Sequence, residues 1–507
     1  MIAKVTSGAI VGLTAVPVEV EVTVIKKGLP SFTIVGLPDK AVSEAKERVR
    51  SAILNINAEF PAYRIIVNLA PADLPKAGPS YDLPIALGIL LASEQLAADT
   101  SDAIVIGELS LDGTVRHTNG VLPLAIMARE KKFKRLFLPK SNAKEAAIIS
   151  GISIFGFDSL LTIFGYLTNT IEISSEPHIL FSSLQTETHA VFDMADVKGQ
   201  EQAKRGLEIA AAGGHNVLLK GVPGAGKTML SRAFPSILPT LTELEALEVT
   251  KIYSITGNLP PGESVVKSRP FRSPHHTTSR IGLIGGGSNP MPGEISLAHR
   301  GVLFLDELPE FPPTVLEALR QPLEDGIVSI ARAAGQVTYP AQFILIAAAN
   351  PCPCGHLGSK RKPCTCLPGQ ILRYRRKVSG ALLDRIDIHL HCPELSPEEL
   401  SHIQQGENSK TIRKRVEKAR EMQRKRFRGT KLQSNAEMSS RDIKKYCELS
   451  DECQDLLRKA VSLFSLSARS YHKMIKLSRT IADLDNSKNI DVKHMSEAFR
   501  YRLKEEE

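Results

Sequence analysis

The eight residues from Gly221 to Thr228 limit what this chain can fold into more than any other part of its sequence. They read GVPGAGKT, which fits the pattern G-x-x-x-x-G-K-[ST], and they stand between the strand-like NVLLK and the helical MLSRAF. Glycines in such a loop let the backbone curl, so that its N–H groups and the start of the next helix face phosphate groups. The sequence therefore predicts a strand, a phosphate-binding loop and a helix within a parallel sheet. The candidate ATP-binding residues are Gly221, Val222, Pro223, Gly224, Ala225, Gly226, Lys227, Thr228 and Met229.

A second segment, GVLFLDE, supplies the acids that such a loop requires. It covers residues 301–307 and has the pattern of a buried strand that ends in Asp306 and Glu307. Together with Thr228, Asp306 would coordinate Mg²⁺ directly or through water; Lys227 would reach the β- and γ-phosphates, and Glu307 would polarise the attacking water. The alternative, a strand whose acids merely cap the following helix, leaves the upstream loop unexplained. We expect hydrolysis of ATP with Mg²⁺ at this site.

Patterns of apolar residues divide the chain into three domains and a linker. Residues 1–173 alternate short β-rich runs with helical patterns, the clearest helix lying at about 40–55, and predict a self-contained α/β domain. Residues 174–190 have no sustained period and predict a linker. Residues 191–395 contain apolar strands separated by helical segments, a pattern typical of a mostly parallel sheet covered by helices. Residues 396–507 are strongly charged and predict a small helical lid.

Composition and length exclude several classes of protein. The chain has 507 residues, of which 42% are hydrophobic and 23% charged, so a folded multidomain protein is expected rather than a disordered or fibrous one. The first residues alternate apolar with polar or small ones, which argues against a signal peptide. The longest apolar run, LPIALGILLA at 83–92, is well below the ~18 residues that span a bilayer. We expect a cytoplasmic protein without membrane association.

A positive charge excess favours a polyanionic partner. The net charge is +9, and the segment from Lys410 to Lys431 alone carries eleven Lys or Arg residues against two Glu. A basic segment of this kind can contact nucleic acid, but it can equally be the solvated face of a helix. The sequence leaves both interpretations open.

Four cysteines lie in one short loop, CPCGHLGSKRKPCTC at residues 352–366. They are Cys352, Cys354, Cys364 and Cys366, out of seven cysteines in the chain. This odd number and this clustering do not indicate a disulfide framework, whereas four thiolates can complete a tetrahedral Zn²⁺ site that ties down a loop with no core of its own. The spacing departs from the usual C-x₂-C, so His356 as a substitute ligand, free thiols and a redox switch remain alternatives. We expect a non-catalytic zinc site.

Further motifs carry a resemblance to a known family. They are GLPDKAVSEAKERVRSAI, RPFRSPHHTTSRIGLIGGG, GVLFLDELPEF, AAANPCPCG, LLDRIDIH and LSARSYHKMIKLSRTIADL, and they extend over essentially the whole chain. With them the sequence resembles the magnesium-chelatase-like branch of the AAA+ ATPases, and within it the competence-associated helicase family known as ComM or YifB. The resemblance implies a hexameric, ATP-dependent DNA helicase or translocase that drives branch migration in homologous recombination, including natural transformation.

The resemblance assigns roles to three residues outside the phosphate loop. Asn350, after FILIAAA, matches the residue that senses the γ-phosphate and positions water, although an Asn before a proline can also simply form a turn. Arg385 matches the arginine that reaches into the neighbouring subunit's site, where a guanidinium offsets charge on the transferring phosphoryl group. Arg469 matches the second sensor, which couples nucleotide state to lid position; it can also be a surface arginine. Competitors for the role of Arg385 are Arg373, Arg375 and Arg376.

Two segments resemble elements that face the ring's pore in this family. About seventy residues separate the phosphate loop from the acidic strand, more than a minimal crossover needs. They include RPFRSPHHTTSRIGLIGGGSNPMPG, which is basic and then Gly-rich, and after Glu324 the segment DGIVSIARAAGQVTYPA predicts a β-hairpin. Such elements touch nucleic acid in the family, which makes Arg272, Arg280 and Arg332 candidate DNA contacts; Arg332 could instead work across the subunit interface.

The N-terminal domain resembles the proteolytic domain of Lon-type proteases. The resemblance rests on APADLPKAGPSYDLPIAL and GELSLDGTVRHTNGVLPLA, and it places Ser80 where that family has its nucleophile. A serine there needs a lysine to take its proton, and the matching position is Leu122. We therefore expect a protease-like fold without protease chemistry. A similar non-proteolytic domain in the bacterial RadA recombination factor forms a platform around DNA, so by analogy this domain stabilises a hexamer and contacts duplex.

Three functions are compatible with these features. The first is the DNA-translocating helicase. The second is a chelatase-type motor that remodels a protein partner, which the ATPase core alone would allow. The third is an ATP-dependent protease, which Ser80 suggests and Leu122 opposes.

Overall fold

The computed structural model contains two compact units, which are described separately. One unit comprises residues 1–186 and 242–267, and the other comprises residues 187–241 and 268–507. We call them the N-terminal unit and the ATPase unit. The predicted fold class is confirmed, because the chain is α/β with a parallel-sheet core and a helical C-terminal region. The structure describes residues 2–74, 76, 78–184, 192–260, 262–287, 290–332, 335–394, 406–464 and 467–502.

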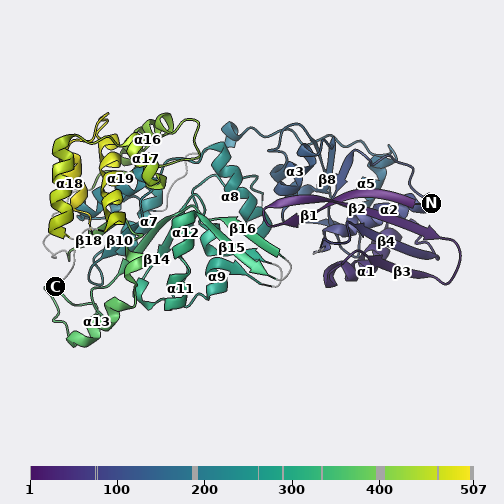
Figure 1. Cartoon of the computed structure of the whole chain (residues 1–507). Helices are drawn as coiled ribbons and strands as arrows, with labels where there is room; N and C mark the ends of the chain where they lie inside the picture. The colour runs from purple at the N-terminus through teal and green to yellow at the C-terminus, as the bar shows by residue number, and fades with distance from the viewer. Residues whose placement is uncertain are drawn as a thin grey trace. The chain divides into compact units, whose positions relative to one another are not determined.

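The N-terminal unit is built on a seven-stranded mixed sheet in the order β3-β4-β2-β1-β5-β8-β9 (Figure 1). Its longest strands, β1 and β2, pair antiparallel over their full length, whereas β5, β8 and β9 continue the sheet in parallel. The strands are β1 (Ile2–Val11), β2 (Thr14–Ile25), β3 (Ser31–Val35), β4 (Arg64–Ala70), β5 (Ala103–Val105), β8 (Arg135–Pro139) and β9 (Ser153–Phe157), with a small ribbon of β6 (Glu108–Leu109) and β7 (Val115–Arg116).

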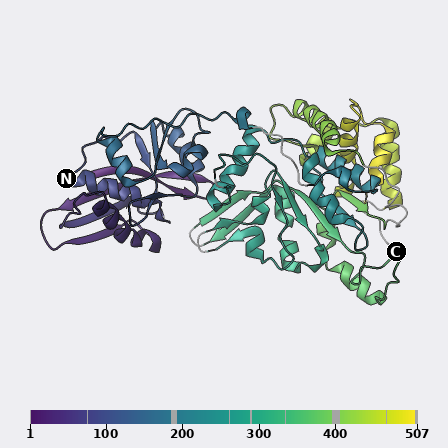
Figure 2. The same ribbon diagram turned by 180° about the vertical axis from the view of Figure 1, so that it is seen from behind.

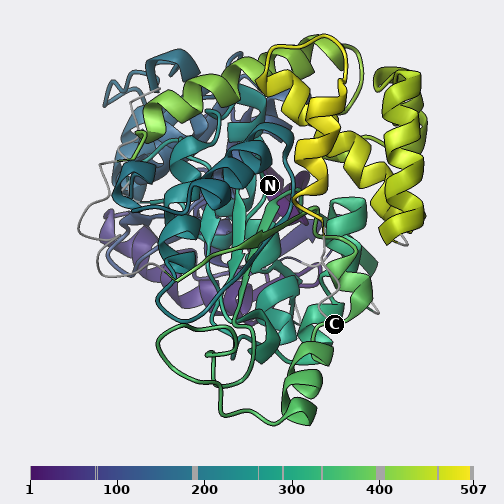
Figure 3. The ribbon, with the colours of Figure 1, turned by 90° about the vertical axis from the view of Figure 1, so that its left-hand side faces the viewer.

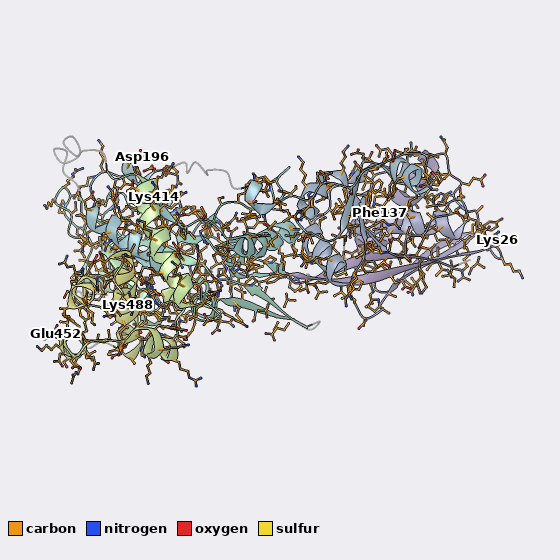
Figure 4. All side chains as sticks on the ribbon, turned by 90° about the horizontal axis from the view of Figure 1, so that it is seen from above. Lys26, Phe137, Asp196, Lys414, Glu452 and Lys488 are labelled. Carbon is orange, nitrogen blue, oxygen red and sulfur yellow. The ribbon has the colours of Figure 1, made fainter. Side chains whose placement is uncertain are left out.

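Alternation of apolar residues explains how this sheet gains a core. In β2 every second residue from Val18 to Val24 is buried, because successive side chains of a strand point to opposite faces. The predicted helix at residues 40–55 is confirmed as α1 (Lys40–Asn55), which begins after Asp39, whose side chain caps the Val42 N–H at 2.8 Å. Phe137, which Figure 4 labels, packs edge-on against neighbouring aromatic rings. The helices are α1, α2 (Asp82–Ala92), α3 (Val121–Glu130), α4 (Ala143–Ala146), α5 (Leu160–Leu167) and α8 (Glu243–Thr256).

Helix α8 belongs to the N-terminal unit although it lies between the two nucleotide-binding segments in sequence. Thr242 and Glu245 form a capping box at its start. Near its end, the Ser254 hydroxyl donates to Glu145 at 2.5 Å, and the Ser254 carbonyl accepts from the N–H of Gly120 at 2.9 Å. Burial raises the pKa of Glu145, while its hydrogen bonds act in the opposite direction. The apolar pattern of the sequence assigns this segment to residues 191–395 and gives no sign of this packing.

The ATPase unit is built on a five-stranded, fully parallel sheet in the order β11-β14-β17-β10-β18. Strands β14 and β17 are buried along their whole length, as expected of a parallel sheet covered on both faces. Two hairpins, β12–β13 and β15–β16, are separate from this sheet. The strands are β10 (Val217–Lys220), β11 (Phe271–Arg272), β12 (Gly285–Gly286), β13 (Met291–Pro292), β14 (Val302–Leu305), β15 (Ile327–Arg332), β16 (Gly335–Pro340), β17 (Ile344–Ala349) and β18 (Ile388–His391).

The C-terminal helices share one apolar core with the sheet. Residues such as Leu207 on α6, Val416 on α16 and Ile481 on α19 are fully buried in the same cluster as the strands β10 and β17. Figures 2 and 3 show these helices gathered at one side of the ATPase unit. The helices are α6 (Glu201–Gly213), α7 (Lys227–Ala233), α9 (Arg280–Ile284), α10 (Glu294–Leu297), α11 (Pro313–Glu317), α12 (Arg320–Asp325), α13 (Pro368–Arg376), α14 (Gly380–Leu383), α16 (Ser409–Arg426), α17 (Ser440–Tyr446), α18 (Asp451–Phe464), α19 (Ala468–Leu484) and α20 (Val492–Phe499).

Parts of the predicted linker and lid boundary lie outside the described residues, namely 185–190 and 396–405. Residues 174–180 contain neither helix nor strand, and the Glu176 N–H donates to the Ile154 carbonyl at 2.8 Å within the N-terminal unit. Among the helices that the structure describes, none is long and apolar enough to cross a membrane.

Candidate functional site

The phosphate loop connects β10 to α7 at the carboxyl end of the parallel strands. Gly224 and Gly226 have φ angles of +79° and +86°, a conformation that glycine adopts without strain. No atom lies within 4 Å of the place where a Cβ would stand on either residue, so the backbone is open at both positions. Gly221 is different, because its Cβ would lie 2.4 Å from the carbonyl oxygen of Cys392. The loop therefore needs glycine for its curvature at two positions and for close packing at a third.

Lys227 stands at the first position of α7 and is almost completely buried. Its Nζ donates to the carbonyls of Gly221 at 2.6 Å and Val222 at 3.0 Å, and to Asn350 Oδ1 at 3.1 Å. Burial lowers the pKa of the Lys227 ammonium, and nearby negative groups, including the Asp306 carboxylate, partly offset that effect. A cation with its N–H groups aimed into the loop is suited to phosphate oxygens.

Asp306 and Glu307 follow β14 at the same edge of the sheet. The Thr228 hydroxyl donates to Asp306 Oδ2 at 3.0 Å, so the two predicted Mg²⁺ ligands already face one another. The other Asp306 oxygen accepts the Glu307 N–H at 3.0 Å, and Glu307 has a φ angle of +53°, which is uncommon for a residue other than glycine. The strand thus ends in a tight turn that separates the directions of its two carboxylates.

Asn350 directly follows β17, the strand between β14 and β10, and its contact with Lys227 joins it to the phosphate loop. One further residue was not predicted from the sequence. Gln200 donates through Nε2 to the Ala225 carbonyl at 3.0 Å and to the Pro393 carbonyl at 2.8 Å, and so fixes the phosphate loop to the segment after β18. No local pattern could have indicated this role, because its partner at Pro393 is 193 residues away in sequence.

A cavity of about 420 Å³ opens beside this edge of the sheet. Its lining includes Gly221, Asn350, Leu357, Tyr374 and His391, which come from the phosphate loop, the strand ends, the cysteine loop and α13. Burial raises the pKa of Tyr374 to about 12, so its hydroxyl stays protonated. The cavity adjoins the phosphate loop and belongs to the same candidate site.

The two arginines predicted to act on the nucleotide meet at a different place, on the carboxylate of Glu324. Arg385 and Arg469 each donate through a terminal guanidinium nitrogen, one to each oxygen of Glu324. The arginines hold the pKa of the Glu324 carboxyl below its usual value, Arg385 through its hydrogen bond first of all. Arg385 also donates to the Ala381 carbonyl at 2.6 Å. The structure therefore groups these three residues, which come from α12, the segment after α14, and α19.

This arginine pair lies at the amino end of the strands. Ile388, which begins β18, pairs in parallel with Val217, which begins β10, and Arg385 comes before that point whereas the phosphate loop comes after the end of β10. The Arg385 carbonyl accepts from Asn216 at 3.0 Å, and Lys473 on α19 donates to the Ile386 carbonyl at 2.8 Å. The pair and the phosphate loop therefore lie at opposite edges of one sheet.

The three competing arginines lie on α13. Arg375 lines the cavity beside the phosphate loop, while Arg373 and Arg376 are exposed on the same helix. Of these three, Arg375 is on the carboxyl side of the sheet, the side opposite to Arg385.

The four cysteines of the loop after β17 converge on one point. The sulfur of Cys352 lies 3.4 Å from that of Cys354 and 3.7 Å from that of Cys364, and the Cys354 and Cys364 sulfurs are 3.6 Å apart. All four ligand atoms, including Cys366 Sγ, lie within 4.8 Å of one another. A tetrahedron with Zn–S bonds of about 2.3 Å has edges of roughly 3.8 Å, so this donor set fits Zn²⁺.

Backbone donors favour a thiolate at one of these four cysteines. The N–H groups of His356 and Thr365 lower the pKa of Cys354 to about 5, which favours a thiolate. His356 itself is not part of the group of potential ligands in the described chain, which consists of cysteines alone. The cysteine loop also packs against the phosphate loop, because a Cβ on Gly355 would lie 2.6 Å from Pro223 Cγ.

The candidate DNA residues have different surroundings. Arg272 makes a two-pronged ion pair with Glu294, at 2.6 and 2.7 Å, and so supports the local fold. Arg280 is exposed at the first position of α9. Arg332 ends β15 in the hairpin β15–β16, which confirms the predicted hairpin, but its side chain lies outside the described atoms.

The basic segment around α16 divides into two groups. Arg413, Arg415, Arg420 and Arg426 bind carbonyl or carboxylate oxygens within the ATPase unit, as in the contact of Arg413 with the Ser236 carbonyl at 2.8 Å. The remaining basic residues are on the exposed face, among them Lys414, which Figure 4 labels on α16. Part of the charge excess is therefore structural.

In the N-terminal unit, Ser80 lies in a short 3₁₀ turn before α2, and Leu122 is fully buried at the start of α3. The Ser80 carbonyl accepts the Gly107 N–H at 3.0 Å. Lys76, four residues before Ser80, is also buried, and its ammonium group donates to the Pro71 carbonyl.

Comparison with known proteins shows which families the chain resembles. Family models for the magnesium chelatase subunit ChlI match residues 18–142 and 193–400, and a model for its C-terminal region matches residues 406–502. The competence protein ComM of Haemophilus influenzae is 44% identical and covers 99% of this chain and 97% of its own length. YifB of Escherichia coli, described as uncharacterized, is 46% identical over 97% of this chain and 96% of its own length.

A more distant relative is the magnesium-chelatase 67 kDa subunit of Heliobacterium mobile. It is 26% identical, and the match covers 45% of this chain and 37% of that protein. Full-length similarity to ComM and YifB, together with the three family models, establishes the relationship: the chain belongs to the magnesium-chelatase-like family of AAA+ ATPases, in the group that includes ComM and YifB.

Proposed function

We propose that this protein is a hexameric ATP-dependent motor that moves along or unwinds DNA and drives branch migration during homologous recombination, including natural transformation. The observation that carries the proposal is the separation of the arginine pair from the phosphate loop on opposite edges of one sheet. A site in which Arg385 assists hydrolysis is then completed only by a second copy of the chain. Head-to-tail contacts of this kind close into rings.

The residues of the phosphate edge supply the binding chemistry. Lys227 would exchange its carbonyl contacts for oxygens of the β- and γ-phosphates, and the N–H groups around Gly224 and Gly226 would hold the same phosphates. Thr228 and Asp306 would hold Mg²⁺, which neutralises charge on the phosphates when it is bound. Glu307 would orient the attacking water, and Asn350, which accepts from Lys227, would contact the γ-phosphate and that water.

Three observations favour DNA as the polymer along which the proposed motor moves. A relative that covers 99% of this chain is named a competence protein, whereas the magnesium-chelatase 67 kDa subunit matches only 45% of it. The net charge is +9, which favours a polyanion. Arg280 is exposed at the start of α9, and Arg332 ends β15 in a hairpin that is separate from the central sheet. Arg272 remains a candidate, although its ion pair with Glu294 competes with phosphate.

We also propose that the cysteine loop binds a structural Zn²⁺. The sulfur separations of 3.4–3.7 Å support four-thiolate coordination, which leaves no open position for catalysis. The proximity of Gly355 to Pro223 gives the metal an effect on the phosphate loop.

The test is ATPase activity on single-stranded, duplex and four-way-junction DNA, at two salt concentrations because phosphate contacts weaken with salt. We expect DNA to stimulate the ATPase activity strongly and the four-way junction to be converted into duplexes when ATP is present. Both effects should be lost in Glu307→Gln. An ATPase that is indifferent to DNA at low salt would contradict the proposal. It would instead favour a chelatase-type motor acting on a protein partner, which the family models also allow.

A further inference from the structure

Helix α16 carries basic residues on two faces. Arginines of one face, such as Arg426, bind oxygen atoms within the ATPase unit. The other face is exposed, as are two basic residues of the turn that follows the helix. From this face, this turn and the last turn of α17 we define a basic patch, whose members are exposed Lys and Arg residues without an ion-pair, hydrogen-bond or ring partner in the described part of the chain. The members are Lys414, Lys418, Arg424, Arg428, Lys431 and Lys444.

Aromatic packing joins the two helices that carry the patch. The ring of Phe427, which follows α16, meets the ring of Tyr446, the last residue of α17, edge-on with centroids 5.4 Å apart. The last turns of α16 and α17 therefore lie side by side (Figure 1). Lys444 comes from this turn of α17, and so it extends the basic surface of α16 across a second element.

Two ordinary roles of surface cations do not account for the patch. A solvated helix face usually balances its charges, but α16 has only the acids Glu417 and Glu421, and Glu421 is already paired with Lys425 at 3.0 Å. Cations are also favourable near the carboxyl end of a helix, but this effect falls off within the last turn. Lys414 and Lys418 lie about two turns or more before that end.

The dimensions of the patch suit the backbone of a nucleic acid. Lys414 and Lys418 are four residues apart on one helix, which is about 6 Å along its axis. Each strand of a DNA duplex has one phosphate per about 3.4 Å of helix axis, so the two ammonium groups match alternate phosphates. The ammonium group of lysine binds phosphate as a point charge without a fixed geometry. Such contacts hold the backbone and read no sequence.

The surroundings of the patch favour duplex over single strands. Proteins that hold single strands stack the bases on aromatic side chains. The exposed residues of α16 and α17 include no aromatic side chain, since Tyr446 is half-buried, and Phe427 beyond α16 is buried. A membrane surface is also a poor partner, because it requires an apolar face, and the apolar face of α16, with Val416, is buried in the core.

The inner face of α16 is bonded to the helix of the phosphate loop. Arg413 donates to the Ser236 carbonyl at 2.8 Å, and the Ser236 hydroxyl donates to the Ser409 hydroxyl at 2.6 Å. Ser236 lies in the 3₁₀ turn that directly continues α7, the helix that begins at Lys227. A polymer bound to the patch is therefore connected to the phosphate loop through a short series of hydrogen-bonded elements.

We propose that the basic patch is a separate DNA-binding surface, which holds the sugar-phosphate backbone of duplex DNA without reading its sequence. It is carried by α16 and α17, whereas the other candidate contacts, Arg280 and Arg332, are on α9 and β15. The inference rests on the proposed function, from which it takes DNA as the polymer. It adds the form of the DNA and the helices that hold it.

The test compares two triple variants of the full-length protein that lose the same charge. The patch variant combines Lys418→Gln, Arg424→Gln and Arg428→Gln. The control variant combines Lys459→Gln, Lys488→Gln and Lys493→Gln, which change exposed lysines on α18, before α20 and on α20. Fluorescence anisotropy measures the Kd for a labelled duplex of arbitrary sequence and for a labelled single strand, over a series of salt concentrations and with a non-hydrolysable ATP analogue.

For the patch variant we expect the Kd for duplex to rise at least about tenfold at about 0.1 M salt. The slope of log K against log salt concentration should become shallower by about 0.9 for each lost phosphate contact, and so by up to about 2.7. The Kd for the single strand should change less than twofold, or about twofold at most. The control variant should keep wild-type values, and both variants should keep the DNA-independent kcat and the KM for ATP, because the patch is remote from the nucleotide.

Several outcomes would overturn the proposal. They are a patch variant with the duplex Kd and salt slope of the wild type, a control variant that loses as much affinity, a single-strand Kd that rises as much as the duplex Kd, and a wild-type protein that binds no duplex at low salt. If the wild type binds duplex but its ATPase activity is not stimulated, the proposed function fails. The duplex Kd of the patch variant against that of the control variant then still decides the role of the patch.

Discussion

The two edges of the five-stranded sheet in the ATPase unit are built in opposite ways. At the carboxyl edge, Lys227, Thr228, Asp306 and Asn350 are linked by hydrogen bonds of 3.0–3.1 Å. At the amino edge, two arginines share one carboxylate, that of Glu324. The first edge collects groups that suit phosphate and Mg²⁺, and the second collects two cations whose shared partner is a carboxylate of the same chain.

Under the proposed function, each edge is half of a site that two neighbouring subunits share. Arg385 comes before Ile388, the first residue of β18, whereas the phosphate loop comes after the end of β10. The four residue pairs that β18 forms with β10 lie between these two positions. A strand rises about 3.3 Å per residue, so these positions are roughly 13 Å apart along the strand, which exceeds the reach of one guanidinium side chain. The Glu324 carboxylate pairs with both arginines and offsets the repulsion between their two positive charges.

The largest expected effect comes from disabling each edge separately. Lys227→Ala should abolish ATP binding, and Arg385→Ala should keep ATP binding but lower kcat by about 10³, the lower value found for an arginine that acts on a transferring phosphoryl group. Either change alone should remove function, because every site of the proposed ring contains both edges. The measurement is ATPase turnover, together with binding of a fluorescent ATP analogue.

Co-assembly of the two inactive variants tests whether the edges belong to different subunits. In a mixed ring, an intact phosphate loop can adjoin an intact Arg385 from its neighbour. Random mixing should therefore restore up to about a quarter of the wild-type rate. If Arg385 served its own chain's nucleotide, mixed rings would stay inactive, and the comparison of the two edges would fail.

Glu324→Gln should have an intermediate effect that is confined to the amino edge. The change removes the charge that holds Arg385 and Arg469 together, so we expect kcat to fall about tenfold with the KM for ATP unchanged. Glu317→Gln is a matched control, since Glu317 pairs at 2.7 Å with Arg320 and not with the arginine pair. A rise in KM in Glu324→Gln would show that the residue acts on the phosphate edge instead.

The carboxyl edge could be predicted from sequence almost completely. The phosphate loop and the acidic strand are short contiguous motifs. The order of apolar strands indicates a parallel sheet, and the loops that leave the carboxyl ends of parallel strands must meet at one edge. Lys227, Asp306 and Asn350 are therefore found together as expected. The four cysteines also converge as expected, because they come from one loop of the chain.

The amino edge and the packing of α8 were not predictable in the same way. Glu324 lies 61 residues from Arg385 and 145 residues from Arg469, so no local pattern joins them. Helix α8 comes after the phosphate-loop segment in sequence, yet Ser254 binds Glu145, 109 residues earlier. His276 belongs to a motif that is recognised by its basic residues. Its contact with Glu307 depends on the pairing of β11 with β14, and β11 has only two residues, too few to give a strand pattern in the sequence.

A smaller effect on the carboxyl edge is expected from loss of the proposed zinc. Cys364→Ser should release the metal, measured by a colorimetric chelator, and raise the KM for ATP about fivefold with little change in kcat. The reason is the packing of Gly355 on Pro223, which supports the phosphate loop from the side of the cysteine loop. Cys453→Ser is the matched control: Cys453 is buried on α18, donates to the Ile490 carbonyl at 3.4 Å, and should leave the metal content unchanged. Wild-type protein that lacks zinc would contradict this prediction.

The smallest effect is expected at Ser80, in the N-terminal unit and outside both edges. A serine nucleophile needs a base, and the position that would supply it is the buried, apolar Leu122, while the ammonium group of Lys76 is already bound to the Pro71 carbonyl. Ser80→Ala should therefore leave ATPase turnover, DNA stimulation and the absence of casein degradation unchanged. Degradation of casein by the wild-type protein, lost in Ser80→Ala, would show that the N-terminal unit has a chemistry of its own. The two edges of the sheet would then belong to the ATPase motor of a protease.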